Sequence, residues 1–211
     1  MHKREFLTAG QDIQSASKVL IMVHGRGSTA DNILSLADHL DVKEFALLAP
    51  QATSNTWYPY SFLMPPMQNE PWLSSALELL KEIVDELKAK EIEEKDIYFL
   101  GFSQGACLTL EFVTRNATRY GGVIAFTGGL IGDKIYSENY KGDFASTPVF
   151  IGSSDPDPHV PVQRVDESAA LLEKMNAAVT KKIYKNMGHT INQDEIRIAN
   201  ELISSSKALQ S

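Results

Sequence analysis

The sequence predicts an α/β fold in which a mostly parallel central sheet is covered by helices on both faces. Apolar runs rich in Val, Ile and Phe alternate with amphipathic, helix-like runs along the chain. Several of the apolar runs lack the alternation of a half-exposed strand, as strands buried on both faces do. The length of 211 residues and the uniform composition predict a single domain, residues 1–211.

Six runs are predicted to be strands of this sheet. They are short, and several are continuously apolar. The runs are Lys18–His24, Phe45–Pro50, Ile97–Phe102, Gly122–Thr127, Pro148–Gly152 and Lys182–Lys185. Residues 1–17 are expected to supply, at most, an additional edge strand.

The spacing of apolar residues predicts three of the helices between these strands. The clearest helix covers residues 72–90, and its apolar stripe consists of Leu73, Leu77, Leu80, Val84 and Leu87. Another is expected from Gln104 to about Asn116. A third follows Pro161, and its apolar face consists of Val165, Ala169 and Leu172.

Capping patterns predict where two further helices begin. Ser28 followed by Asp31 resembles a capping box, so a helix is expected from there to about Leu40. Asn192 with Glu195 forms a second capping pattern, and this helix should end near Ser205.

Composition and charge exclude several classes of function. The formal net charge of −7 leaves no basic stripe, so nucleic acid is not an expected partner. No stretch approaches the roughly 18 apolar residues of a membrane span, and no secretory signal is visible. The single cysteine, Cys107, cannot form an internal disulfide and is expected to be a small buried side chain. These features predict a cytoplasmic protein without membrane insertion, whose oligomeric state is left open.

The strongest functional signal is the pattern G-x-S-x-G at Gly101–Gly105. A predicted strand precedes it and a predicted helix follows, which is the setting of a nucleophile elbow. The central residue of such a turn is cramped, so small residues are needed two positions away on either side. Ser103 is therefore predicted to be the nucleophile of a hydrolase, and the alternative is an idle serine in a glycine-rich turn.

A serine hydroxyl needs a base, and the base needs a carboxylate that orients it. His189 follows the last predicted strand, where a loop at the carboxyl end of the sheet would bring it beside the elbow. The loop after the preceding strand offers two carboxylates, Asp155 and Asp157. Asp157 is the preferred partner, and the chain order Ser, Asp, His is that of α/β-hydrolases. The other aspartate would be a turn residue, and His159 is expected to pack within the loop.

The glycine-flanked turn at Met22–Ser28 is predicted to supply part of an oxyanion hole. Its donors would be the backbone N–H groups of Arg26 and of Gln104, the residue after the nucleophile. His24 would hold this turn in place. The side chain of Arg26 is not needed for the hole, and is expected either to be solvated or to select a polar group of the substrate.

Two long loops could shape the substrate pocket. The segment Thr53–Pro71 contains Trp57, Phe62 and Met64, which are predicted to form a wall for an acyl chain. Leu130, after a Gly-Gly pair in the second long loop, is a weaker candidate for the same wall. The alternative is that these side chains belong to the core beneath the loops.

Together these motifs resemble the phospholipase/carboxylesterase family, which includes acyl-protein thioesterases and small bacterial-type carboxylesterases. The matching motifs are H-G-R-G at His24–Gly27, G-F-S-Q-G-A at Gly101–Ala106, D-P-H-V-P at Asp157–Pro161 and G-H at Gly188–His189. The resemblance implies an α/β-hydrolase fold without a large lid. It also implies hydrolysis of small-molecule acyl esters, thioesters or lysophospholipids through an acyl-enzyme, with no cofactor and no metal.

The resemblance does not decide between the two aspartates. The loop Gly152–Val160 is two residues longer than the family's usual loop and holds both. Two other functions also remain open: a lactone or dienelactone-type hydrolase of the same fold, and a non-catalytic binding protein. A serine at position 103, where the dienelactone group often has cysteine, argues against the first. The presence of nucleophile, base, acid and hole together argues against the second.

Overall fold

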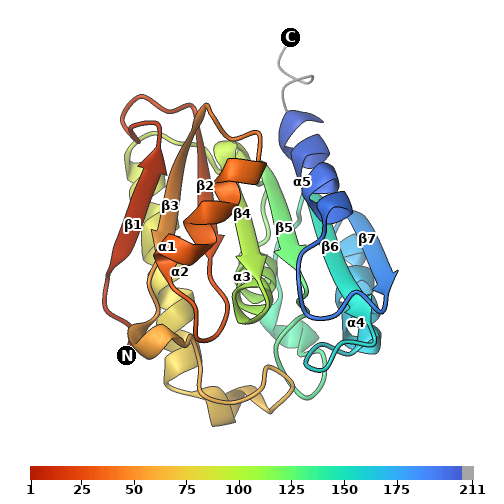
Figure 1. The fold of residues 1–211 in the computed structure, drawn as a ribbon. Coiled ribbons are helices and arrows are strands. Elements are labelled where there is room, and N and C mark those ends of the chain that lie inside the picture. The colour runs from red at the N-terminus through yellow and green to blue at the C-terminus, as the bar shows by residue number, and fades with distance from the viewer. Residues whose placement is uncertain (206–211) are drawn as a thin grey trace.

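The computed structural model describes residues 1–205 and contains one seven-stranded sheet with the strand order β1-β3-β2-β4-β5-β6-β7 (Figure 1). Strands β2 to β7 run parallel, and β1 pairs antiparallel with β3 at one edge. The strands are β1 (Phe6–Gly10), β2 (Lys18–Val23), β3 (Phe45–Pro50), β4 (Ile97–Phe102), β5 (Gly122–Phe126), β6 (Pro148–Asp155) and β7 (Ala178–Lys185). The predicted α/β fold is confirmed.

All six predicted strands are present, and the differences lie at the edges of the sheet. Strand β7 begins at Ala178, before the predicted Lys182, and β6 continues past Gly152 to Asp155. Strand β1 is exposed along its whole length. Edge strands of this kind lack a continuous apolar run, so their sequences give a weaker signal than those of central strands.

Five α-helices cover the two faces of the sheet among the described residues. They are α1 (Ala30–Leu34), α2 (Trp72–Ala89), α3 (Gln104–Arg115), α4 (Val162–Lys174) and α5 (Gln193–Ser205). Figure 1 shows α1 and α5 in front of the sheet, where their apolar residues pack in one buried cluster. The buried residues of α2, α3 and α4 pack against the opposite face in a second cluster.

The start of α1 differs from the prediction. Thr29, not Ser28, is the N-cap, and its hydroxyl accepts the N–H of Asn32 at 3.2 Å. The N–H of Ser28 donates to Gly25, so Ser28 still belongs to the preceding turn. The helix also ends early, at Leu34, and a 3₁₀ turn continues from there. The capping box of α5 forms as predicted: the N–H of Asn192 donates to the Glu195 carboxylate, and the N–H of Glu195 donates to the side-chain oxygen of Asn192, both at 2.9 Å.

The parallel strands end along the lower edge of the sheet in Figure 1, and the loops that follow them meet there. The turn from β4 to α3 carries Ser103, the loop after β6 carries Asp157, and the loop after β7 carries His189. The long segment between β3 and α2 crosses the same edge. Among residues 1–205, no helix has the length and apolarity needed to cross a membrane.

Candidate active site

Ser103 occupies a strained turn between β4 and α3. Its backbone angles are φ 55° and ψ −119°, a region that residues with a Cβ atom rarely adopt. The two flanking glycines are required by close approach. A Cβ atom at Gly101 would lie 2.5 Å from the carbonyl oxygen of Gly105, and a Cβ atom at Gly105 would lie 2.1 Å from that of Val23. Larger residues at positions 101 and 105 would therefore clash with the backbone, and the turn at Ser103 requires glycine at both.

The structure brings Ser103, His189 and Asp157 into one hydrogen-bonded chain. His189 Nε2 lies 2.8 Å from Ser103 Oγ, and His189 Nδ1 lies 2.9 Å from Asp157 Oδ2. The ring of Phe102 packs against the imidazole with a centroid separation of 5.3 Å. The three side chains come from three different loops, so only the folded sheet places them together.

The carboxylate of Asp157 is fully buried and fully hydrogen-bonded. Its Oδ1 accepts the backbone N–H groups of His159 and Val160, both at 2.8 Å. Burial by itself raises the pKa of Asp157, but the bonds from His159, His189 and Val160 together hold that pKa below its usual value. The group is therefore ionised at neutral pH and can balance a positive charge on the imidazole.

The structure also distinguishes the two aspartates of this loop. Asp155 is the last residue of β6, and its side chain is exposed. Its backbone carbonyl accepts the N–H of Asn186, which continues the pairing of β6 with β7. Asp157, and not Asp155, is the residue that contacts His189.

One residue of the site escaped the sequence analysis. The buried hydroxyl of Ser154 accepts the N–H of Gly188 at 3.0 Å and donates to the carbonyl oxygen of Pro156 at 3.1 Å. It therefore links the loop that carries Asp157 to the loop that carries His189. No sequence pattern points to this role, because Ser153 and Ser154 are adjacent and chemically identical.

The turn after β2 and the start of α3 each keep a backbone N–H group without a partner in the described part of the chain, and both border the cavity that contains Ser103. Gly27 has φ +75° and donates its N–H to the carbonyl of Asn55. The N–H of Arg26 has no acceptor among residues 1–205. Gln104 is the first residue of α3, so its N–H has no partner within the helix. The two residues predicted to form an oxyanion hole therefore both keep an unused donor.

His24 holds the turn after β2 in place, as the sequence predicts. His24 is fully buried, its Nδ1 donates to the carbonyl of Gly25 at 2.8 Å, and its Nε2 accepts the N–H of Ala52 at 3.1 Å. Burial lowers the pKa of His24, so the ring is neutral, as its role of donor at one nitrogen and acceptor at the other requires.

The side chain of Arg26 is neither fully solvated nor free, because it bonds to backbone carbonyls of the long loop. Its Nη1 donates to the carbonyl of Pro59 at 2.8 Å, and its Nη2 donates to that of Tyr60 at 2.7 Å. A third, longer bond of 3.4 Å joins Nη1 to Thr56 Oγ1. The guanidinium thus fastens the turn that follows β2 to the long loop between β3 and α2.

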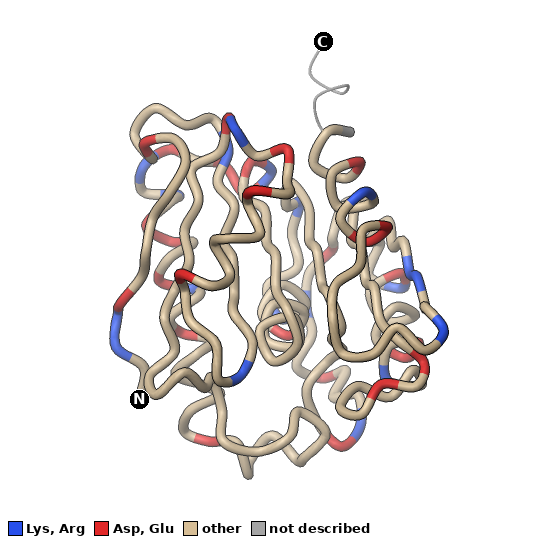
Figure 2. Tube along the Cα trace, viewed as in Figure 1, with Lys and Arg blue, Asp and Glu red and all other residues tan. Residues whose placement is uncertain are grey.

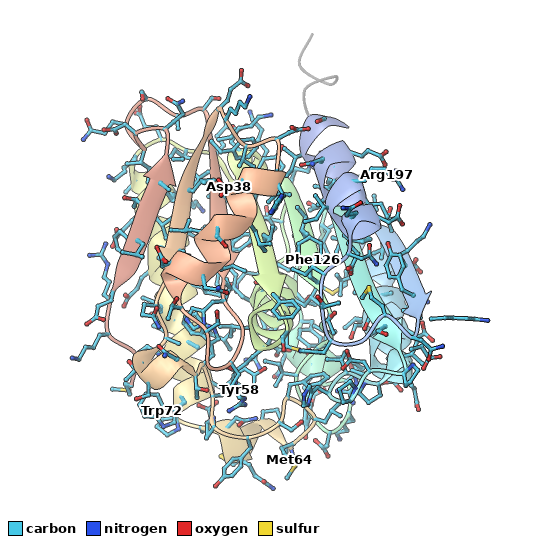
Figure 3. All side chains as sticks on the ribbon, in the orientation of Figure 1. Asp38, Tyr58, Met64, Trp72, Phe126 and Arg197 are labelled. Atoms are coloured by element: carbon cyan, nitrogen blue, oxygen red, sulfur yellow. The ribbon has the colours of Figure 1, made fainter. Side chains whose placement is uncertain are left out.

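A cavity of about 620 Å³ opens beside Ser103 and His189. Phe62 lines it, together with Tyr58 and Leu63 from the same loop and Val160 from the loop that carries Asp157. Figure 3 shows Tyr58 in the lower part of the molecule, above Met64. The cavity is mainly apolar in its lining side chains, which suits an acyl group.

Three residues predicted for the acyl wall lie outside the lining of this cavity as described for residues 1–205. Trp57 is fully buried beneath the loop, and its Nε1 donates to the carbonyl of His24 at 2.8 Å. Leu130 is also fully buried. Met64 lies farther out than Tyr58 in Figure 3. For Trp57 and Leu130 the alternative of core packing is the one observed.

Cys107 lies under the cavity on α3 and is buried, as predicted. Burial raises the pKa of its thiol to about 12, so the sulfur stays protonated and unreactive. Within the described part of the chain, no group of three or more His, Cys, Asp or Glu side chains is arranged to hold a metal ion.

The known proteins that this chain resembles include esterases and thioesterases. The profile of the family described as Phospholipase/Carboxylesterase matches residues 8–207. A solved phospholipase/carboxylesterase from Dyadobacter fermentans is 56% identical, with a TM-score of 0.94, over 96% of this chain and 97% of that one. Acyl-protein thioesterase 1 of Saccharomyces cerevisiae is 26% identical over 90% of this chain and 93% of its own length. A carboxylesterase from Bacillus cereus, 22% identical with a TM-score of 0.76 over 96% of this chain and 94% of that one, shares the fold.

Proposed function

Because this chain belongs to the phospholipase/carboxylesterase family, and is thus a hydrolase of ester bonds, we propose that it cleaves small carboxylic esters with Ser103 as nucleophile. His189 is the general base and Asp157 is the carboxylate that orients it. The observation that carries this proposal is the unbroken path of hydrogen bonds from Asp157 through His189 to Ser103 Oγ. Both bonds fall within the distances that proton transfer and ring orientation require.

In the first half of the reaction, Ser103 Oγ attacks the carbonyl carbon of the ester while His189 Nε2 takes the hydroxyl proton. The carbonyl oxygen becomes an oxyanion, which the N–H groups of Arg26 and Gln104 stabilise. The intermediate then breaks the bond to the leaving alcohol, and His189 returns the proton to that oxygen. An acyl-enzyme and a free alcohol result.

In the second half, water attacks the acyl-enzyme and gives up a proton to His189. The carbonyl oxygen again occupies the oxyanion hole. When this intermediate breaks, His189 returns the proton to the leaving Ser103 oxygen and the carboxylic acid is released, which restores the free enzyme. Asp157 remains ionised throughout and stabilises the transient imidazolium, which agrees with the lowered pKa of its carboxyl.

Several observations favour a small ester over other substrates of the family. The cavity of about 620 Å³ is within the range that holds a small molecule, and its walls are the apolar side chains of Phe62, Leu63 and Val160. The yeast relative is named for acyl-protein thioesters, and a thioester would use the same steps with a thiol as leaving group. The nearer relationship, at 56% identity, is to a protein named as a phospholipase/carboxylesterase.

A fluorophosphonate probe tests the proposal directly, since it reacts with an activated serine and not with an idle one. We expect one adduct on Ser103, located by peptide mass spectrometry, and hydrolysis of 4-nitrophenyl butyrate that Ser103→Ala abolishes. An absence of both in folded protein would favour a binding protein built on a hydrolase fold. Hydrolysis of lactones in preference to open-chain esters would favour the lactonase alternative.

A further inference from the structure

Arg26 is the one residue of the cavity lining, as described for residues 1–205, that carries a permanent charge. The other lining residues are neutral or apolar apart from two histidines. The three acceptors that the guanidinium meets are also neutral: the hydroxyl of Thr56 and the carbonyls of Pro59 and Tyr60. No carboxylate is among them, so the positive charge beside the cavity has no counter-ion from the described chain.

The hydrogen bonds of Arg26 leave one edge of its guanidinium unused. The group has five N–H donors in a planar fork. Nη1 donates to the carbonyl of Pro59 and Nη2 to the carbonyl of Tyr60, so the edge formed by these two nitrogens is occupied. Nη1 also donates to the hydroxyl of Thr56. The Nε–H and the second hydrogen of Nη2 form the remaining edge. Two parallel donors of this kind match the two oxygens of a carboxylate.

The surroundings of this cation lack competing anions. Residues 45–69, which include the loop bonded to the guanidinium, contain no Lys, Arg, Asp or Glu. In Figure 2 this stretch is tan throughout, whereas acidic and basic residues are distributed along much of the rest of the chain. The chain as a whole has a formal net charge of −7. The net charge of the chain therefore repels a negatively charged substrate, whereas the permanent charge in the described lining of this cavity attracts it.

From these observations we propose that the cavity selects esters whose acyl group ends in a carboxylate, that is, monoesters of short dicarboxylic acids. The free edge of the Arg26 guanidinium binds the carboxylate while Ser103 attacks the ester carbonyl. This inference rests on the proposed function. The acyl chain must be short, because the N–H proposed to bind the oxyanion and the guanidinium proposed to bind the carboxylate belong to the same residue.

The test compares two esters of the same shape and different charge. Monoethyl glutarate carries the carboxylate, and ethyl glutaramate carries a neutral amide in its place. Both release ethanol, which a coupled alcohol oxidase assay measures. We expect the kcat/KM of the anionic ester to be about tenfold higher, a factor that corresponds to about 1.4 kcal/mol. The preference should lie in KM and should shrink in about 1 M salt, where screening acts over about 3 Å.

Variants separate the charge of Arg26 from its bonds to the loop. Arg26→Gln removes the charge but keeps an amide donor and the backbone N–H, so the preference should fall to about one. Arg26→Lys keeps the charge without the fork and should retain part of the preference. Thr56→Val is the matched control, because it removes one partner of the guanidinium and leaves the charge. In this variant the ratio of the two esters should stay at its wild-type value.

The outcomes distinguish this inference from the function on which it rests. A wild-type ratio near one would overturn the inference, as would a ratio that Arg26→Gln leaves unchanged while both rates fall together. The second result would assign the guanidinium to the loop alone. Hydrolysis of 4-nitrophenyl butyrate without hydrolysis of monoethyl glutarate would also overturn it and leave the proposed function standing. If no ester is hydrolysed and Ser103 takes no fluorophosphonate, the proposed function fails and the inference fails with it.

Discussion

The carboxyl group of Glu195 lies directly against Gly152 of β6, where a Cβ atom would come within 2.2 Å of Oε1. Glu195 is fully buried, and its Oε2 accepts the N–H of Asn192 at 2.9 Å. Its Oε1 has no hydrogen-bond partner in the described part of the chain. Burial, opposed by the bond from Asn192, raises the pKa of this carboxyl to about 7. A buried acid whose pKa is close to neutral pH thus lies in the first turn of α5, the helix that follows the His189 loop.

This relationship predicts how the stability of the protein depends on pH. The pKa of Glu195 is about 7 in the folded chain and 4.5 when unperturbed, so the folded state binds the proton more tightly. The contribution of this group to the free energy of unfolding should fall as pH rises between these two values, by about 3 kcal/mol in all. Urea unfolding at a series of pH values measures it.

Glu195→Gln supplies the comparison for that measurement. Glutamine keeps an oxygen for the N–H of Asn192 and does not titrate. The variant should match the wild type near pH 5 and exceed its stability near pH 8. Glu173→Gln, at an exposed position, should keep the wild-type slope. An identical slope in the Glu195 and Glu173 variants would contradict the assignment.

The bridge made by Ser154 predicts a loss of activity without a loss of fold. Ser154→Ala removes both the acceptor of the Gly188 N–H and the donor to Pro156. Because the Asp157 and His189 loops then lose their shared tie, kcat should fall about tenfold, the effect of roughly one net hydrogen bond. The neighbouring Ser153 is the control, since its hydroxyl is buried with no partner among the described residues.

Steady-state kinetics and melting curves on both serine variants test whether Ser154 positions the Asp157 and His189 loops. Ser153→Ala should keep the wild-type kcat, and Ser154→Thr, which retains the hydroxyl, should recover part of the loss. Equal kcat values for Ser153→Ala and Ser154→Ala would mean that Ser154 does not position the two loops.

The contrast between the two aspartates gives a prediction with a large effect. Asp157→Asn keeps the shape of the side chain but favours the wrong tautomer of His189, so kcat should drop by about 10⁴. Asp155→Asn alters an exposed side chain that does not contact the imidazole, and should change kcat little. The two variants, assayed with one ester at one pH, rank the residues. The reverse ranking would remove Asp157 from the mechanism.

A matched pair of glycine substitutions tests the packing beneath the elbow. Gly105→Ala would place a Cβ atom 2.1 Å from the carbonyl oxygen of Val23, so the helix and β2 must separate. We expect a loss of more than about 3 kcal/mol in the free energy of unfolding. Gly27→Ala meets no atom within 4 Å but has φ +75°, so its cost should be about 1–2 kcal/mol. Similar losses in both variants would contradict the crowding argument.

Local patterns predicted the parts of this fold that local chemistry determines. The glycines around Ser103 and the continuous apolar runs of the central strands identified the elbow and the interior of the sheet. Contacts between distant segments were less predictable. Trp57 and Leu130 have the character of pocket residues, and nothing in their neighbourhood shows that they face the core instead. Sequence patterns favoured Asp157 over Asp155 only weakly, because the contacts that distinguish the two depend on how the loop folds against the backbone of Val160 and the ring of His189.

The side chain of Gln104 joins the elbow to the loop that lines the cavity, a role distinct from that proposed for its backbone N–H. Its Oε1 accepts the N–H of Trp57 at 2.9 Å, and its Nε2 donates to the carbonyl of Tyr58 at 2.8 Å. Gln104→Glu keeps the size of the side chain and the backbone N–H proposed for the oxyanion hole. It replaces the donor with an oxygen that faces the carbonyl of Tyr58, and a buried pair of acceptors is costly.

We therefore expect Gln104→Glu to lower the melting temperature and to raise KM, because the loop that lines the cavity loses its attachment to the elbow. Gln68→Glu, which makes the same change at an exposed position in the same loop, should leave both quantities near their wild-type values. Thermal unfolding and steady-state kinetics on the two variants measure this difference. If Gln104→Glu lowers kcat alone and leaves KM and the melting temperature unchanged, the side chain acts at the reacting centre and not on the loop.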